Sequence, residues 1–211
     1  MTPKTTERFV IEGPAGALEM VVNAPEHAPR GIALVAHPHP LQGGTLDNKV
    51  AQTLAKTFFA LGYASVRFNF RSVGQSAGTF TDGIGETADA LAALSHAKTR
   101  FGDLPVVLAG FSFGSFVQTL VAKTVAAERL VLVGPAVKRF AVDTVPGDTI
   151  VVHGEEDDVV PLADVLAWAR PQGLPVVVFP GCGHFFHGHL PQLQRVIAGM
   201  WHGRAPVIPG A

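Results

Sequence analysis

Short apolar runs alternate along this chain with stretches whose apolar residues recur at helical spacing. Continuous apolar runs are typical of strands that are covered on both faces. Six such runs occur, at 31–37, 64–70, 105–109, 130–133, 149–153 and 175–179. Helical stripes lie between or after them: Val50, Leu54, Phe58 and Leu61; Phe113, Val117, Leu120 and Val121; and Leu190, Leu193, Val196, Ile197 and Met200. This alternation predicts the α/β fold class, with a mostly parallel, doubly wound sheet and helices on both of its faces.

The first part of the chain has a different pattern. Two alternating stretches, 8–12 and 17–22, flank a turn of glycine, proline and alanine at 13–16, which predicts an N-terminal antiparallel hairpin. No linker or internal repeat divides the remainder, so residues 1–211 are expected to form a single domain. The tails 1–6 and 205–211 have no periodicity and are expected to fray.

A serine stands where the 105–109 run gives way to a helical stripe. Gly110, Ser112 and Gly114 form a G-x-S-x-G motif at this point. A serine on such a sharp turn takes strained backbone angles, and its neighbours two positions away must be small so that strand and helix can pass closely. The helix that follows directs its N-terminal dipole at a developing negative charge. We therefore predict that Ser112 is a catalytic nucleophile.

A serine hydroxyl becomes a good nucleophile only beside a general base, which an acid must orient. When the nucleophile follows a strand in this way, the acid and then the histidine come later in the chain. Four acids compete for the orienting role after the 149–153 run: Glu155, Glu156, Asp157 and Asp158. His184 is the first histidine after the glycine turn that follows the last strand, ahead of His187 and His189. We predict His184 as the base, while the four acids remain open on this reasoning.

Together, the segments 110–114, 153–161 and 181–184 make the sequence resemble the α/β-hydrolase superfamily over nearly its whole length. In many members the strand before the acid ends in H-G-x-x-D-x-x-V-P, and 153–161 matches that string. The resemblance therefore points to Asp157 as the residue that orients His184.

Two further segments, 37–50 and 67–78, are similar to a small, lid-less bacterial branch related to dienelactone hydrolases. Those enzymes have a cysteine nucleophile where this chain has a serine, so their lactone substrate does not carry over. Many relatives also have glycine where Ser72 stands, a change that affects backbone freedom rather than the catalytic residues. Only 134–147 separates two predicted strands at the place where a lid is usually inserted. An open site beside Leu41 and residues 71–78 is therefore expected, with a preference for short acyl groups.

The resemblance also implies an oxyanion hole made of two backbone N–H groups. One belongs to the residue after the nucleophile, Phe113. The other comes from the loop 37–41, in which the two prolines have no N–H. Three residues of that loop can donate: His37, His39 and Leu41. The likeness to H-G-x loops selects His39.

These residues predict a serine hydrolase that cleaves carboxylic ester or thioester bonds of small acyl substrates through an acyl-enzyme. The same constellation would serve an acyltransferase or a cofactor-free perhydrolase. One rival class is a non-catalytic binding module that has the same fold. Another is a metal-binding protein, with ligands drawn from His37, His39, His184, His187 and His189. None of the usual metal-motif spacings is met, so no metal or cofactor is expected.

Composition narrows the choice of partners. The formal net charge is -1 and the basic residues are scattered, which argues against nucleic acid. No run approaches the roughly 18 apolar residues that span a bilayer, and residues 1–10 lack the apolar core of a signal peptide. A soluble, cytoplasmic protein without a membrane partner is expected. The single cysteine, Cys182, cannot form an intramolecular disulfide. Nothing in the sequence indicates an oligomeric state.

Overall fold

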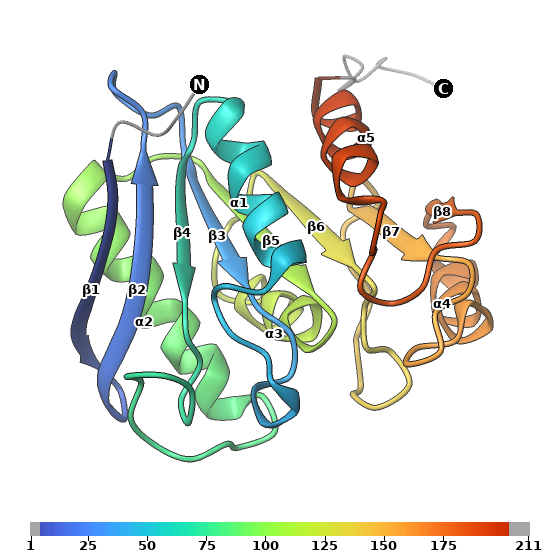
Figure 1. The fold of residues 1–211 in the computed structure, drawn as a ribbon, viewed down its shortest axis with the longest axis horizontal. Helices are drawn as coiled ribbons and strands as arrows, with labels where there is room; N and C mark the ends of the chain where they lie inside the picture. The colour runs from blue at the N-terminus through green and yellow to red at the C-terminus, as the bar shows by residue number, and fades with distance from the viewer. Residues whose placement is uncertain (1–4, 203–211) are drawn as a thin grey trace.

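All eight strands of the structure, a computed structural model that describes residues 5–202, belong to one sheet (Figure 1). The strands are β1 (Thr5–Gly13), β2 (Gly16–Ala24), β3 (Ile32–Ala36), β4 (Ala64–Phe68), β5 (Val106–Phe111), β6 (Arg129–Val133), β7 (Ile150–Gly154) and β8 (Val176–Phe179). Their order across the sheet is β1-β2-β4-β3-β5-β6-β7-β8. Only the pairings of β2 with β1 and with β4 are antiparallel. The predicted mostly parallel sheet with an N-terminal hairpin is confirmed.

The hairpin is longer than the sequence pattern indicated. Its register runs from the pair Gly13 and Gly16 at the turn to the pair Thr5 and Ala24 at the open end. The expectation that residues 1–6 fray is therefore wrong for residues 5 and 6, because β2 extends far enough to give them backbone partners. Residues 1–4 and 205–211 lie outside the described part of the chain.

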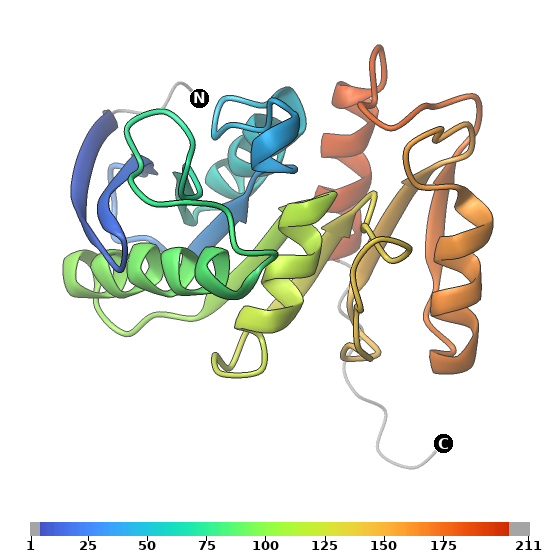
Figure 2. The same cartoon turned by 90° about the horizontal axis from the view of Figure 1, so that it is seen from below.

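Helices cover both faces of the sheet (Figure 2). They are α1 (Lys49–Ala60), α2 (Ile84–Phe101), α3 (Phe113–Val121), α4 (Leu162–Ala169) and α5 (Leu190–His202). Two short 3-10 helices, η1 (Pro40–Gln42) and η2 (Arg170–Gln172), complete the described chain. α1 and α5 pack on one face, whereas α2, α3 and α4 pack on the other.

Strand β3, near the middle of the sheet, is apolar throughout because both of its faces are covered. In β3, Ile32, Leu34 and Ala36 belong to the core under α2 and α3. The alternate residues Ala33 and Val35 belong to the core under α1 and α5. All five side chains are essentially inaccessible to solvent. A continuous apolar run is what a strand between two helical layers requires, since neighbouring side chains point to opposite faces.

Helix α2 is the one long helix whose apolar stripe does not stand out in the sequence. Its buried face begins with one glycine and two acidic residues and continues with Ala90, Ala93, Leu94 and Ala97. The spacing is helical, but alanine gives little contrast with its neighbours in a hydrophobic pattern. The small side chains allow α2 to lie close against the sheet.

Helix α3 approaches β3 and β5 so closely that two positions leave no room for a side chain. A Cβ on Gly110 would lie 2.4 Å from the carbonyl carbon of Gly114, and a Cβ on Gly114 would lie 2.4 Å from the carbonyl oxygen of Ala36. Two buried side chains of α3 also bind strand carbonyls: Ser115 Oγ donates to Gly110 O at 2.8 Å, and Gln118 Nε2 donates to Leu34 O at 2.9 Å. Helix and strands are thus locked together beside residue 112.

Substituting Gly114→Ala should destabilise the protein by about 2–3 kcal/mol, because the new methyl group meets strand backbone that cannot move aside. Gly199→Ala is the matched control. Gly199 lies in α5, and a Cβ placed on it would meet nothing within 4 Å, so the variant should gain about 0.5–1 kcal/mol from helix propensity. Urea unfolding of both variants gives the two free energies. Equal stabilities would contradict the close approach.

Candidate active site

Ser112 stands at the junction of β5 and α3 with a backbone conformation that serine rarely adopts. Its φ is 54° and its ψ is −117°. The strain is held by the surroundings: Ser112 N donates to Val133 O at 2.9 Å, and Phe116 N and Ser115 N both point back to Ser112 O. The side chain is therefore presented at the carboxyl edge of the sheet, and it is 7% exposed.

Asp157 and His184 come together from two different loops. His184 Nδ1 lies 2.7 Å from Asp157 Oδ2, and both side chains are buried. The other carboxylate oxygen, Oδ1, accepts hydrogen bonds from Val159 N at 3.0 Å and Val160 N at 2.7 Å. Burial by itself would raise the pKa of Asp157, but the bonds from His184 and Val160 outweigh it and lower that pKa below its usual value. The carboxylate is thus held as an anion facing the imidazole.

The loops that carry these two residues are tied to each other. Glu155 N donates to Phe179 O at 3.0 Å, and Glu156 N donates to Cys182 O at 2.9 Å. Gly154 permits this approach, because a Cβ there would lie 2.3 Å from Cys182 O. The spacing between Asp157 and His184 is therefore fixed by backbone hydrogen bonds rather than by the side chains alone.

His153 stabilises the loop that carries Asp157. Its Nε2 lies 2.8 Å from Val160 O, so Nε2 carries the proton and donates to that carbonyl. The same Nε2 is 3.4 Å from Asp157 Oδ2. Burial lowers the pKa of His153, which keeps the ring neutral. The histidine that opens the H-G-x-x-D-x-x-V-P string thus fixes the loop on which the aspartate lies.

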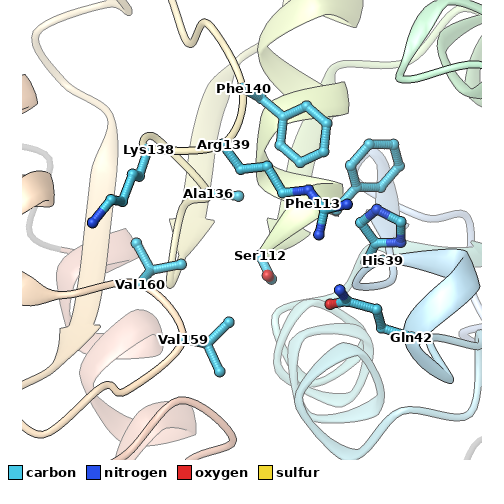
Figure 3. Close-up of a pocket in the computed structure, with 10 residues that line it drawn as sticks. All are labelled: His39, Gln42, Ser112, Phe113, Ala136, Lys138, Arg139, Phe140, Val159 and Val160. Atoms are coloured by element: carbon cyan, nitrogen blue, oxygen red, sulfur yellow. The ribbon is translucent and has the colours of Figure 1, made fainter.

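Two adjoining hollows open on either side of Ser112. The larger, of about 150 Å³, is lined by His39, Gln42, Ser112, Phe113, Ala136, Lys138, Arg139, Phe140, Val159 and Val160 (Figure 3). The smaller, of about 90 Å³, shares His39, Gln42, Ser112 and Val159 and adds Pro38, Gly43, Gly44, Asn48, His184 and Phe185. Ser112 and His184 therefore face one space. No hydrogen bond joins their side chains within the described residues.

The walls of these hollows differ from the expected ones. Neither Leu41 nor residues 71–78 line them. The loop after β6 was expected to be too short for a lid, and no part in the site was predicted for it. It contributes four residues to the wall of the larger hollow: Ala136, Lys138, Arg139 and Phe140. No periodicity in that loop marks the residues that turn inward, so no signal in the sequence could have identified them.

The predicted oxyanion donors border the larger hollow together. His39 is the N-cap of η1, and its Nδ1 accepts a hydrogen bond from Leu41 N at 3.2 Å. The N–H of Leu41, one of the three candidate donors, is therefore already engaged. Within residues 5–202, the backbone N–H groups of His39 and Phe113 have no hydrogen-bond acceptor. Phe113 begins α3, so its N–H also lies at the positive end of that helix.

His37 is a structural residue at the end of β3. Its Nδ1 donates to Pro38 O at 2.7 Å, and its Nε2 accepts from Phe70 N at 3.0 Å. Complete burial lowers the pKa of His37 to about 3. Both ring nitrogens are occupied, and the ring ties the end of β3 to the segment that follows β4.

The five histidines considered as metal ligands do not form a cluster. His37 is engaged as described and His184 is paired with Asp157. His187 is exposed and stacks on Phe185. Across the described part of the chain, no group of three or more histidine, cysteine, aspartate or glutamate side chains is arranged to hold a metal ion. Likewise, no helix there is long and apolar enough to cross a bilayer.

Comparison with solved structures places the fold among the serine hydrolases. A structure from Coxiella burnetii, described as an α/β serine hydrolase homologue, is 38% identical and has a TM-score of 0.86, covering 92% of this chain and 96% of its own. One from Xanthomonas campestris, described as an α/β serine hydrolase without a lid, is 32% identical with a TM-score of 0.90 and covers 99% of both chains. The protein is an α/β serine hydrolase.

The family model for the serine aminopeptidase S33 family matches residues 29–144, slightly more than half of the chain. The chain belongs to this family of α/β hydrolases. An uncharacterized protein of Rickettsia prowazekii is 32% identical over 175 residues, which cover 75% of this chain and 70% of that protein.

His37 should make the protein less stable as the pH falls. Above pH 6.5, the ordinary pKa of histidine, the ring is neutral in both states. Below that value the unfolded chain takes up a proton, while the folded protein, with a pKa of about 3, does not. Each such histidine removes up to about 1.4 kcal/mol per pH unit. Buried His153, whose pKa is also lowered, adds to this loss.

The measurement is the free energy of urea unfolding between about pH 4.5 and 7.5 for the wild type and for His37→Gln. The variant should be less stable at the upper end of this range, and its stability should depend less steeply on pH in the acidic half. Identical slopes would show that His37 takes up its proton equally in both states.

Proposed function

We propose that the protein hydrolyses carboxylic ester or thioester bonds of small acyl substrates with a Ser112–His184–Asp157 triad. The observation that carries this proposal is the 2.7 Å contact between His184 Nδ1 and Asp157 Oδ2, beside a hollow that His184 shares with the strained Ser112. An acid, an imidazole and a serine in this chain order are the machinery of acyl transfer.

The contact also fixes the tautomer of the base. Asp157 is held as an anion and can only accept, so the proton shared between them lies on His184 Nδ1. Nε2 is then the unprotonated nitrogen of the ring. It takes the hydroxyl proton of Ser112 as Oγ attacks the carbonyl carbon. Asp157 stabilises the imidazolium that forms.

The remaining steps use the same groups. The carbonyl oxygen becomes an oxyanion, which the N–H groups of Phe113 and His39 bind. When the intermediate collapses, the bond to the leaving oxygen or sulfur breaks and His184 Nε2–H protonates that atom. A water molecule, deprotonated by His184 Nε2, then attacks the carbonyl carbon of the acyl-enzyme. The bond from that carbon to Ser112 Oγ breaks, the carboxylic acid leaves, and His184 returns the proton to Oγ.

An ester or thioester suits the site better than a peptide with a free amino terminus. An aminopeptidase must bind the substrate's ammonium group, which calls for an acidic side chain beside the nucleophile. None of the described residues that line the two hollows is aspartate or glutamate. The charged residues there are Lys138 and Arg139, both cationic.

The two hollows divide the substrate between them. His184 must reach the leaving group, and it lines the smaller hollow with Phe185. The alcohol or thiol part therefore belongs on that side. The acyl part extends into the larger hollow, past Phe113 and Phe140. A cavity of about 150 Å³ is enough for a benzene-sized group, so a short acyl chain fills it.

Replacing either Ser112 or His184 with alanine should lower kcat for p-nitrophenyl acetate by about 10⁴-fold or more, because the residues of a triad act as a unit. Ser112→Ala should also abolish covalent labelling by a fluorophosphonate. His187→Ala is the matched control: its ring is exposed and lines neither hollow, so the variant should retain most activity. A Ser112→Ala enzyme with full activity would contradict the proposed function.

The size of the larger hollow predicts the acyl-chain preference. Each methylene that becomes buried contributes about 0.8 kcal/mol, or about fourfold in kcat/KM, until the cavity is full. The values for p-nitrophenyl acetate, butyrate and hexanoate should therefore rise, those for octanoate should level off, and palmitate should be poor. Steady-state kinetics in the absence of detergent provides the comparison. A maximum at palmitate would reveal a hydrophobic tunnel absent from the two hollows.

A further inference from the structure

The larger hollow contains a guanidinium group that the proposed chemistry does not use. Arg139 comes from the loop after β6, and Figure 3 shows its side chain extending toward the space between Ser112 and His39. Lys138, the other cation of this wall, extends away from Ser112 in the same view. Arg139 also contacts the Phe140 ring, with its Cζ 5.8 Å from the centroid.

This guanidinium has no carboxylate partner. Within residues 5–202, no aspartate or glutamate oxygen lies within 4.0 Å of Arg139, whereas Lys138 lies 3.4 Å from Asp164. Asp82 and Glu86 are both close enough to act on the neighbouring His39 ring. Asp82 is exposed, and the Glu86 oxygens already accept from Thr81 N, Thr81 Oγ and Gly83 N. Arg139 is exposed to solvent, so its guanidinium donors are open to an anionic group of a ligand that enters the hollow.

A second donor in the same wall is also unsatisfied. His39 is 6% exposed, and its Nδ1 accepts from Leu41 N, so the proton of the neutral ring lies on Nε2. Within the described residues His39 Nε2 is buried and has no hydrogen-bond partner. Burial first, and then the positive charge of Arg139, lower the pKa of His39. Figure 3 shows the Arg139 side chain extending toward the His39 ring. The two groups favour an acceptor that carries negative charge.

We propose that the acyl group of the substrate carries a carboxylate, which Arg139 binds in the larger hollow, so that the enzyme prefers monoesters or monothioesters of short dicarboxylic acids. This inference rests on the proposed function, since it assigns the acyl part to the hollow away from His184. The apolar residues Ala136, Phe113 and Phe140 enclose the methylenes between the ester and the carboxylate. A guanidinium pairs with a carboxylate through two parallel hydrogen bonds, and a carboxylate is the anion that a dicarboxylic acid provides at the far end of its chain.

The test compares substrates that differ only at the end of the acyl chain. Mono-p-nitrophenyl succinate, glutarate and adipate are measured against p-nitrophenyl butyrate, pentanoate and hexanoate, in which a methyl group replaces the carboxylate. Ser112→Ala enzyme gives the uncatalysed rate, which is subtracted because a free carboxylate can attack its own ester. The readout is the ratio of kcat/KM for each anionic and neutral pair.

In the wild type at least one of the three ratios should exceed about ten, and it should fall as NaCl is raised from about 0.02 to 0.5 M, since salt screens the attraction at this partly open site. Arg139→Gln should lower that ratio by about tenfold or more, Arg139→Lys should recover part of it, and Arg139→Glu should bring it below one. Arg195→Gln is the control, because this substitution removes the same charge at a distant place. Arg195 lies on the exposed side of α5 and lines neither hollow.

The outcomes separate this inference from the proposed function. Ratios near one that do not respond to Arg139→Gln, with neutral esters still cleaved through Ser112, would overturn the carboxylate preference alone. An equal drop of the ratio in Arg195→Gln would also overturn it, since the effect would then come from net charge. An enzyme that cleaves none of the six esters would overturn the proposed function together with the inference.

Discussion

The structure depends above all on the close approach of α3 to the carboxyl ends of β3 and β5. Because Gly110 and Gly114 have no Cβ, the helix can begin directly over Ala36 and the strained Ser112 can stand at the edge of the sheet. The same contact fixes the proposed oxyanion donors, since the N–H of Phe113 begins α3 and the loop of His39 continues from β3. One steric constraint therefore sets the positions of Ser112 and of both proposed oxyanion donors.

The other half of the proposed triad is built by hydrogen bonds rather than by close packing. The loops after β7 and β8 are joined by the bond from Glu156 N to Cys182 O, and His153 fixes the Asp157 loop through Val160 O. The buried carboxylate remains charged because three donors surround it. Had these bonds been left unmade, the desolvation of the carboxylate would favour its protonated form, which orients a histidine poorly.

Most of the fold could be predicted because its signals are local. Strands between two helical layers are mostly apolar on both faces, and the stripes of α1, α3 and α5 use large side chains. Helix α2 was not predicted because its buried face is built largely from alanine, and residues 5 and 6 join β1 only because β2 is long enough to pair with them.

The site was predictable only in part. Ser112 followed from its motif, whereas Asp157 needed the family resemblance, since spacing alone did not separate it from three neighbouring acids. Ser72 indeed takes a φ of 68°, the conformation that favours the glycine of its relatives. The walls of the larger hollow could not be predicted, because they depend on how an aperiodic loop folds back over Ser112.

The two sides of the site are consequently held in different ways. The proposed chemistry lies on strand ends and a helix start, where a shift of any backbone atom would meet buried neighbours. Arg139 lies on the loop after β6, which is anchored at a distance from it. Trp168 Nε1 donates to Val142 O at 3.0 Å, and Val145 N donates to Gln172 Oε1 at 2.9 Å. A substitution on this loop can change the charge and shape of the acyl side without disturbing the strand that presents Ser112. In the proposed enzyme, substrate preference is thus separable from catalysis, because loops carry specificity while the strands and helices beneath them hold the reacting groups.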